Sequence, residues 1–129
     1  GINASVKLEK CRGEIADKLG CDKNEIYFTS CGSESDNLAI LGTAYAKERR
    51  RGGRIITTDS EHAGVENAMQ ALEKDGFEVI RISTRGGVLD WEQYKAALND
   101  RVFLVSMMMV NNETGAYYDL KRAFTMAKV

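Results

Sequence analysis

The stretch RIITTDSEHAGVENAMQALEKDGFEVIRI, from Arg54 to Ile82, indicates the fold. It begins with a short strand-prone run, Arg54 to Thr58, and ends with Phe77 to Ile82, in which apolar and polar residues alternate. Between the two, Val65 to Lys74 carries apolar residues at helical spacing, and Gly76 closes the helix. A strand, a helix and a second strand of these lengths predict a βαβ unit with parallel strands.

The flanking sequence continues the same alternation of helices and strands. In chain order we expect a helix over Ser5 to Leu19, a strand over Glu25 to Thr29, a helix over Asn37 to Arg51 closed by Gly52 and Gly53, a short helix from its cap Asp90 to Leu98, a strand over Val102 to Met108 and a helix over Leu120 to Val129. The Val102 strand is almost wholly apolar, so we expect it at the centre of the sheet. The predicted fold class is α/β, a three-layer αβα arrangement with a mostly parallel sheet.

Composition excludes several classes of function. The chain has 129 residues with 18 basic and 19 acidic side chains, a net charge of −1, which does not suggest a nucleic-acid or membrane partner. The densest basic run, Lys47 to Arg51, lies at the end of a predicted helix, where positive charge complements the helix dipole. The longest apolar run, Phe103 to Val110, is too short to span a bilayer.

The cysteines predict neither a disulfide framework nor a metal site. Cys11, Cys21 and Cys31 are odd in number and none forms a CxxC pair. Reduced thiols in the cytoplasm are the simplest interpretation. The chain also begins and ends in predicted helices and contains no proline, so we expect it to be a piece of something longer.

Three loops follow the carboxyl ends of predicted strands, where parallel sheets bind their ligands. They are Ser30 to Asp36, Asp59 to Gly64 and Asn111 to Gly115. In the first, a strand leads through Gly32 into a helix whose first turn includes Ser33. The N–H groups of that turn, with the Ser33 hydroxyl, could bind a phosphate. The alternative is that Ser33 is an ordinary helix N-cap.

The other two loops carry His62 and the pair Asn111 and Asn112. His62 is the only histidine and could be a general base, a metal ligand or a surface for stacking, although no second soft ligand lies at helical spacing from it. It could also be a solvent-exposed loop residue. Asn112 can both donate and accept, as a phenolic oxygen on a ring would require. The alternative for the asparagines is a turn that reverses the chain.

Taken together and in order, FTSCGSESDNLAI, TTDSEHAGV and VSMMMVNNETG resemble segments of cysteine desulfurases, in the class V aminotransferase group of fold-type I pyridoxal phosphate enzymes. The resemblance extends from about Val6 to the end of the chain. It implies that residues 1–129 are a partial cofactor-binding large domain of a pyridoxal phosphate-dependent transferase. It also implies site roles. Gly32 and Ser33 would bind the cofactor phosphate, His62 would stack on the ring and assist proton transfer, and Asn112 would contact the phenolic oxygen.

The sequence departs from the family pattern in three ways. Cys31 replaces a usual glycine, and Met109 stands where many members have histidine. The family's Schiff-base lysine segment, its ring-nitrogen aspartate and its persulfide cysteine have no match here. Lysines such as Lys74, Lys95 and Lys121 lie on predicted helices outside any such motif. Pyridoxal chemistry needs an amine and an acid of this kind, so we expect the chain alone to be inactive.

The function that the resemblance implies is therefore that of a fragment. The parent would remove sulfur from L-cysteine, giving alanine and a persulfide, would pass the sulfur to an acceptor protein, and would be a cytoplasmic homodimer serving sulfur metabolism such as iron–sulfur cluster assembly. It would use no nucleic acid and no membrane. Two alternatives stay open: another class V enzyme, such as an aminotransferase, a selenocysteine lyase or a related carbon–sulfur lyase, and a non-catalytic scaffold domain.

Overall fold

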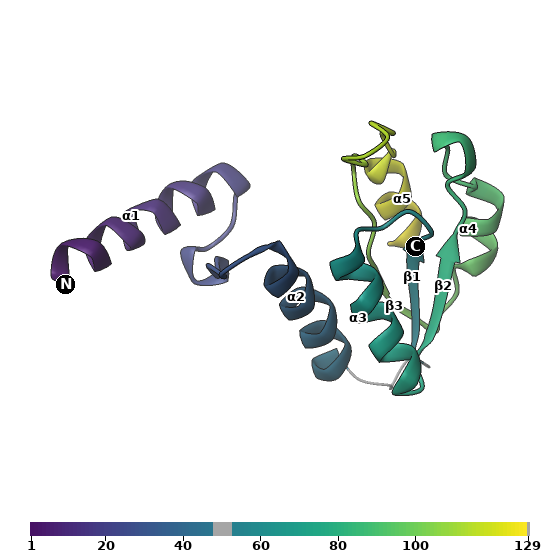
Figure 1. Ribbon diagram of the computed structural model, residues 1–129, viewed down its shortest axis with the longest axis horizontal. Coiled ribbons are helices and arrows are strands. Elements are labelled where there is room, and N and C mark those ends of the chain that lie inside the picture. Colours follow the sequence, from purple (N-terminus) through teal and green to yellow (C-terminus); the bar gives the residue numbers. More distant parts are fainter. Residues whose placement is uncertain (48–52, 129) are drawn as a thin grey trace. The chain divides into compact units, whose positions relative to one another are not determined.

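The computed structural model describes residues 1–47 and 53–128. The chain divides into two compact units, Gly1–Cys31 and Gly32–Val129 (Figure 1). The first unit holds one long helix, α1 (Ile2–Leu19), which ends where Gly20 takes a left-handed conformation with φ of 69°. Glycine has no Cβ atom to oppose that conformation, so it is a favourable helix stop. The predicted Ser5 to Leu19 helix is confirmed and begins three residues earlier.

The predicted strand over Glu25 to Thr29 is wrong. Glu25 instead ends a short 3-10 helix, η1 (Lys23–Glu25). The Asp22 carboxylate accepts the Asn24 N–H at 2.8 Å, and the Glu25 carboxylate accepts the Asp22 N–H at 2.7 Å. This reciprocal cap stabilises a turn in place of an extended chain.

Two of the residues that follow this turn, Ile26 and Phe28, contact the Arg12 side chain of the same unit. The Arg12 guanidinium donates to the Ile26 carbonyl and lies 4.8 Å from the centroid of the Phe28 ring. A strand pairs with a neighbouring strand, and the sheet of the described residues consists of β2, β1 and β3 alone.

In the second unit the described residues form a parallel sheet of three strands: β1 (Arg54–Thr58), β2 (Glu78–Ile82) and β3 (Val102–Val105). Their order is β2-β1-β3, and both pairings are parallel, as the βαβ pattern predicted. The prediction that the apolar Val102 strand is central is wrong, because β1 is the central strand of the described sheet. The apolar side chains of β3 are only half-buried, so their hydrophobicity does not reflect a central position.

Within the described residues of this unit there are four α-helices: α2 (Gly32–Lys47), α3 (Ala63–Lys74), α4 (Trp91–Ala97) and α5 (Leu120–Ala127). A short 3-10 turn, η3 (Arg85–Gly87), precedes α4. The predictions for α3, α4 and α5 are confirmed within two residues of the bounds that the structure describes. Helix α2 begins at Gly32, five residues earlier than predicted, and its predicted end with Gly52 lies outside the described residues, as does Val129.

The helices cover both faces of the sheet, which confirms the three-layer α/β arrangement (Figure 1). On one face, Ile55 of β1 packs with Ile40 of α2 and with Met69 and Leu72 of α3. On the other face, Ile56 packs with a cluster that includes residues of α4 and α5. Side chains of β1 therefore alternate between two cores, and complete burial of each such aliphatic side chain contributes about 1.5–3 kcal/mol.

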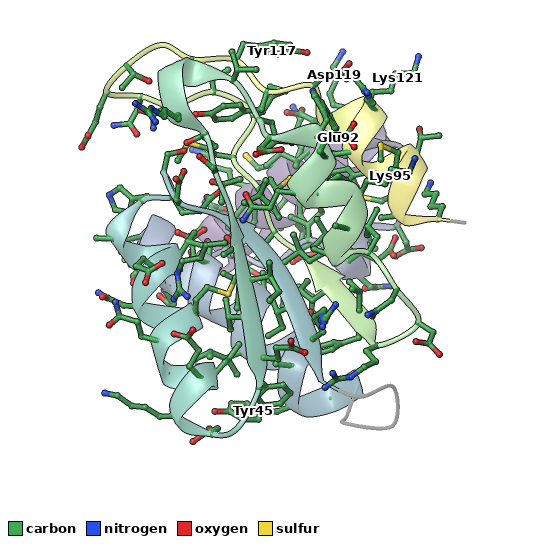
Figure 2. The ribbon with its side chains drawn as sticks, turned by 90° about the vertical axis from the view of Figure 1, so that its right-hand side faces the viewer. Tyr45, Glu92, Lys95, Tyr117, Asp119 and Lys121 are labelled. Carbon is green, nitrogen blue, oxygen red and sulfur yellow. The ribbon has the colours of Figure 1, made fainter. Side chains whose placement is uncertain are left out.

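Helices α4 and α5 carry charged side chains on their outer surfaces. Figure 2 shows Glu92 and Lys95 on α4 and Lys121 on α5 pointing away from the sheet, and all three are exposed. In the described part of the chain, no helix is long and apolar enough to cross a membrane.

Candidate functional site

The carboxyl ends of β1 and β3 lie at the same edge of the sheet, because the two strands are parallel. An open pocket of about 380 Å³ lies at this edge. Its lining includes His62 from the loop after β1, Asn112 from the loop after β3, and Asp36 from α2. The structure thus brings together two of the side chains that the sequence singled out, His62 and Asn112.

Ser33 borders this group rather than lining the pocket. Ser33 is the second residue of α2 and therefore lies within the first helical turn. It is not the N-cap, which is the residue that precedes the helix. A Cβ atom placed on Gly64 would lie 3.2 Å from Ser33 Oγ, 3.2 Å from Asp36 Oδ2 and 3.4 Å from His62 Nδ1. Ser33 and His62 therefore approach the same small space, which a glycine keeps open. Gly32, the first residue of α2, is exposed and has room beside its Cα atom.

His62 is the N-cap of α3. Its Nδ1 accepts the Gly64 backbone N–H at 3.1 Å while the rest of the imidazole is exposed. Because Nδ1 acts as an acceptor, the proton of the neutral ring is assigned to Nε2. The cap fixes the orientation of the ring, so His62 offers a flat face and one N–H at the pocket.

The two asparagines have different environments. Asn111 is buried, and its Oδ1 accepts the N–H groups of Glu113 at 2.9 Å and Thr114 at 3.0 Å within the same loop. Its Nδ2 donates to the carbonyl of Ser60, in the loop after β1, at 3.2 Å. The predicted turn is therefore made by Asn111. Asn112 is exposed and lines the pocket, so its amide can contact a ligand.

Glu61 and Asp36 are two pocket residues to which the sequence analysis gave no role. Burial raises the pKa of the Glu61 carboxyl, and the negative charge of Asp36 acts in the same direction, while hydrogen bonds from Thr58 and Met108 oppose the shift. The sequence held one signal for Glu61: it directly precedes His62, in the loop that follows the carboxyl end of β1. Its hydrogen-bond partner Met108 lies 47 residues away, so sequence alone could not identify the contact.

Two departures from the family pattern lie at or near these segments. Met109 directly follows the pocket residue Met108, and 55% of its surface is exposed. In the first unit, the Cys31 Sγ atom lies 3.9 Å from the Ser30 hydroxyl oxygen.

The chain belongs to the class V aminotransferase family, since the family model Aminotransferase class-V matches residues 1–129. A curated relative, the NifS/IcsS protein homolog of Lactobacillus delbrueckii subsp. bulgaricus, is 48% identical over 122 residues, which is 94% of this chain and 31% of that protein. Cysteine desulfurase IscS of Haemophilus influenzae is 43% identical over 122 residues, 94% of this chain and 30% of that protein.

Solved structures agree with the sequence relatives. A NifS-like protein matches with a TM-score of 0.89 and 36% identity, over 99% of this chain and 35% of that chain. DndA from Streptomyces lividans matches with a TM-score of 0.90 and 33% identity, over 100% of this chain and 36% of that chain. The family resemblance predicted from the three loops is confirmed, and this chain spans about a third of the length of its relatives.

Class V aminotransferases and cysteine desulfurases depend on pyridoxal phosphate. The residues present fit the parts of that molecule. An exposed hydroxyl in a first helical turn suits a phosphate, an exposed imidazole face suits an aromatic ring, and an amide suits a phenolic oxygen. Two carboxylates, Asp36 and Glu61, also line this pocket.

Proposed function

We propose that this chain is the partial cofactor-binding large domain of a pyridoxal phosphate-dependent cysteine desulfurase. The parent enzyme would remove sulfur from L-cysteine and release alanine. The observation that carries the proposal is that His62 and Asn112, from two different loops, line one pocket beside the first turn of α2. When bound, pyridoxal phosphate supplies the electron sink that such chemistry requires.

In this proposal each residue acts on one part of the ligand. Ser33 and the N–H groups of the first turn of α2, including that of Gly32, bind the phosphate. The His62 ring lies against the pyridine ring, and its Nε2 holds a proton that can be exchanged with the substrate. The Asn112 amide donates to the phenolic oxygen.

The amine that such an enzyme needs would come from the rest of the parent protein. Lys74, Lys95 and Lys121 lie on α3, α4 and α5, and none of the described lysines lines the pocket of His62 and Asn112. The 129-residue chain alone should therefore release no sulfide from L-cysteine.

The experiment compares the parent enzyme with its Ser33→Ala variant in equilibrium dialysis against pyridoxal phosphate. Loss of a hydrogen bond to a charged phosphate oxygen should weaken binding by about tenfold or more. Thr43→Ala, which removes a half-buried hydroxyl farther along α2, is the matched control and should leave the affinity unchanged. Equal affinities for wild type and Ser33→Ala would count against the phosphate site.

We further propose that the parent is a cytoplasmic homodimer that hands sulfur to an acceptor protein, as in iron–sulfur cluster assembly. The names of the relatives support the sulfur chemistry. Cys11 and Cys21 are free thiols, which suits a reducing compartment. Sedimentation of the purified parent tests the dimer, and fractionation of its cells tests the compartment.

A further inference from the structure

Glu61 joins the two loops that carry His62 and Asn112. Its Oε1 atom accepts the Thr58 hydroxyl at 2.7 Å and the Met108 backbone N–H at 2.9 Å. Thr58 is the last residue of β1, and Met108 lies three residues beyond the end of β3. One carboxylate oxygen therefore connects the ends of two neighbouring strands.

The hydrogen bond from Met108 to Glu61 takes the place of a main-chain hydrogen bond between β1 and β3. The N–H of Ser106 donates to the Ile56 carbonyl at 2.9 Å, so a regular parallel ladder would next bring the N–H of Met108 to the Thr58 carbonyl. The Met108 N–H instead reaches the Glu61 side chain. The main chain can thus leave the sheet at this point, toward Asn112, without leaving a half-buried N–H unsatisfied.

Neighbouring contacts show why the hydrogen bonds of Glu61 to Thr58 and Met108 matter for the pocket. Glu61 precedes His62 directly, and both residues line the pocket together with Met108 and Asn112. On the other side of Glu61, the Ser60 carbonyl accepts the Asn111 amide at 3.2 Å. Residues 60 and 61 therefore each bind the segment that leads to Asn112, and Glu61 does so through a side chain.

We propose that Glu61 is a positioning residue of the site, whose side-chain oxygen holds the segment bearing Asn112 in register with the loop bearing His62. The ligand in this proposal rests on the proposed function, whereas the tie itself is a property of the protein without cofactor. A glutamine at position 61 keeps an oxygen that can accept both hydrogen bonds, whereas a leucine of similar volume removes the acceptor.

The first measurement is amide hydrogen exchange of Met108 in the cofactor-free parent protein. Glu61→Leu should speed exchange of this amide by about tenfold or more, because a protecting hydrogen bond is lost, whereas Glu61→Gln should stay within about threefold of wild type. Glu92→Leu and Glu92→Gln are matched controls, because Glu92 is exposed on α4 (Figure 2). Unchanged exchange in Glu61→Leu would overturn the proposal.

The second measurement is the affinity of the parent for pyridoxal phosphate by equilibrium dialysis. Glu61→Leu should weaken binding by about tenfold, and Glu61→Gln should restore it to within about threefold, because the lost element is a hydrogen-bond acceptor. Equal loss in both variants would assign the effect to the charge of Glu61 and sink the positioning role.

A further variant keeps the test decisive if Glu61→Leu does not fold. Thr58→Val removes the hydroxyl that donates to Glu61 and lies 3.5 Å from the Ser60 hydroxyl, at nearly constant volume. It should give smaller changes of the same sign in both measurements. No change in either would contradict the proposal. Failure of the proposed function looks different: wild-type protein would not bind pyridoxal phosphate, yet Met108 exchange would still respond to Glu61→Leu.

Discussion

Ser33 Oγ and His62 Nδ1 face the same point, where a Cβ atom on Gly64 would lie 3.2 Å from the first and 3.4 Å from the second. Gly64 is buried near the start of α3, where alanine would otherwise favour the helix. The absence of a side chain at residue 64 therefore keeps the first turns of α2 and α3 close together.

Gly64→Ala should weaken cofactor binding without unfolding the protein. The added methyl group displaces the Ser33 hydroxyl, while the gain in helix propensity, up to about 1 kcal/mol, offsets the crowding in the free energy of unfolding. Equilibrium dialysis and urea denaturation of the same variant separate the two effects. Gly42→Ala within α2, where a Cβ atom would meet nothing within 4 Å, is the control.

Two substitutions of His62 should separate its cap from its ring. Asparagine is a good N-cap, so His62→Asn should unfold at nearly the wild-type urea concentration, whereas His62→Ala should lose about 1 kcal/mol. Both variants lack the imidazole, so both should lose sulfur release from cysteine in the parent enzyme. Full activity in His62→Asn would show that the ring has no part in the reaction.

Arg81 should stabilise the fold in a pH-dependent way. Its guanidinium binds Glu66 at 2.9 Å and Glu73 at 2.8 Å, joining β2 to α3, and these hydrogen bonds lower the pKa of both carboxyls below the ordinary 4.5. Carboxyls with lowered pKa values contribute stability above their unfolded-state pKa and lose it as the pH falls through the folded-state value. The contribution should therefore be present at pH 7 and decline as the pH falls below the ordinary carboxyl pKa of 4.5.

Arg81→Met should accordingly cost about 1 kcal/mol at pH 7, a modest value because the three side chains are partly exposed, and less at pH 3. Urea denaturation at the two pH values measures the difference. Arg85→Met, at an exposed arginine in η3, is the control. An equal cost at both pH values would mean that packing of the Arg81 stem, and not its charge, stabilises the fold.

Tyr94 should anchor α5 to α4. Its side chain is fully buried, and its hydroxyl donates to the Ala123 carbonyl at 2.8 Å. Burial also raises the pKa of this hydroxyl, so it remains a donor. Tyr94→Phe removes this hydrogen bond and should cost about 1 kcal/mol in thermal or urea unfolding. Tyr117→Phe, at an exposed tyrosine (Figure 2), should have no effect.

The sequence predicted the elements whose periodicity was clear. Residues 54–82 gave a parallel βαβ unit because strand alternation and helical spacing were both present. The strand expected over Glu25 to Thr29 failed because strand propensity does not show whether a neighbouring strand exists. The order of strands failed for a related reason: the apolar character of β3 indicates contact with a core but not which neighbours it has.

The sequence predicted which loops would form the candidate site, but not the direction in which each side chain points. The rule that ligands bind at the carboxyl edge selected the loops of His62 and Asn112 correctly as neighbours. The resemblance selected Asn112 rather than Asn111 for the ligand contact, and Asn112 does line the pocket. The local pattern alone does not show that Asn111 is turned inward, because its Nδ2 binds the carbonyl of Ser60, 51 residues away. Glu61 was missed for the same reason, since its partner Met108 is distant in sequence.

The contacts of the loop after β1 also bear on whether the protein folds before it binds its cofactor. Asp59 accepts hydrogen bonds from Thr84, Ser60 contacts Tyr118, and Glu61 holds Met108, so three consecutive residues depend on segments 25 to 58 positions away. Contacts between residues so far apart in sequence raise the contact order, and domains rich in such contacts fold slowly. The pocket beside this loop should therefore bind pyridoxal phosphate only once residues 59–61 contact these later segments.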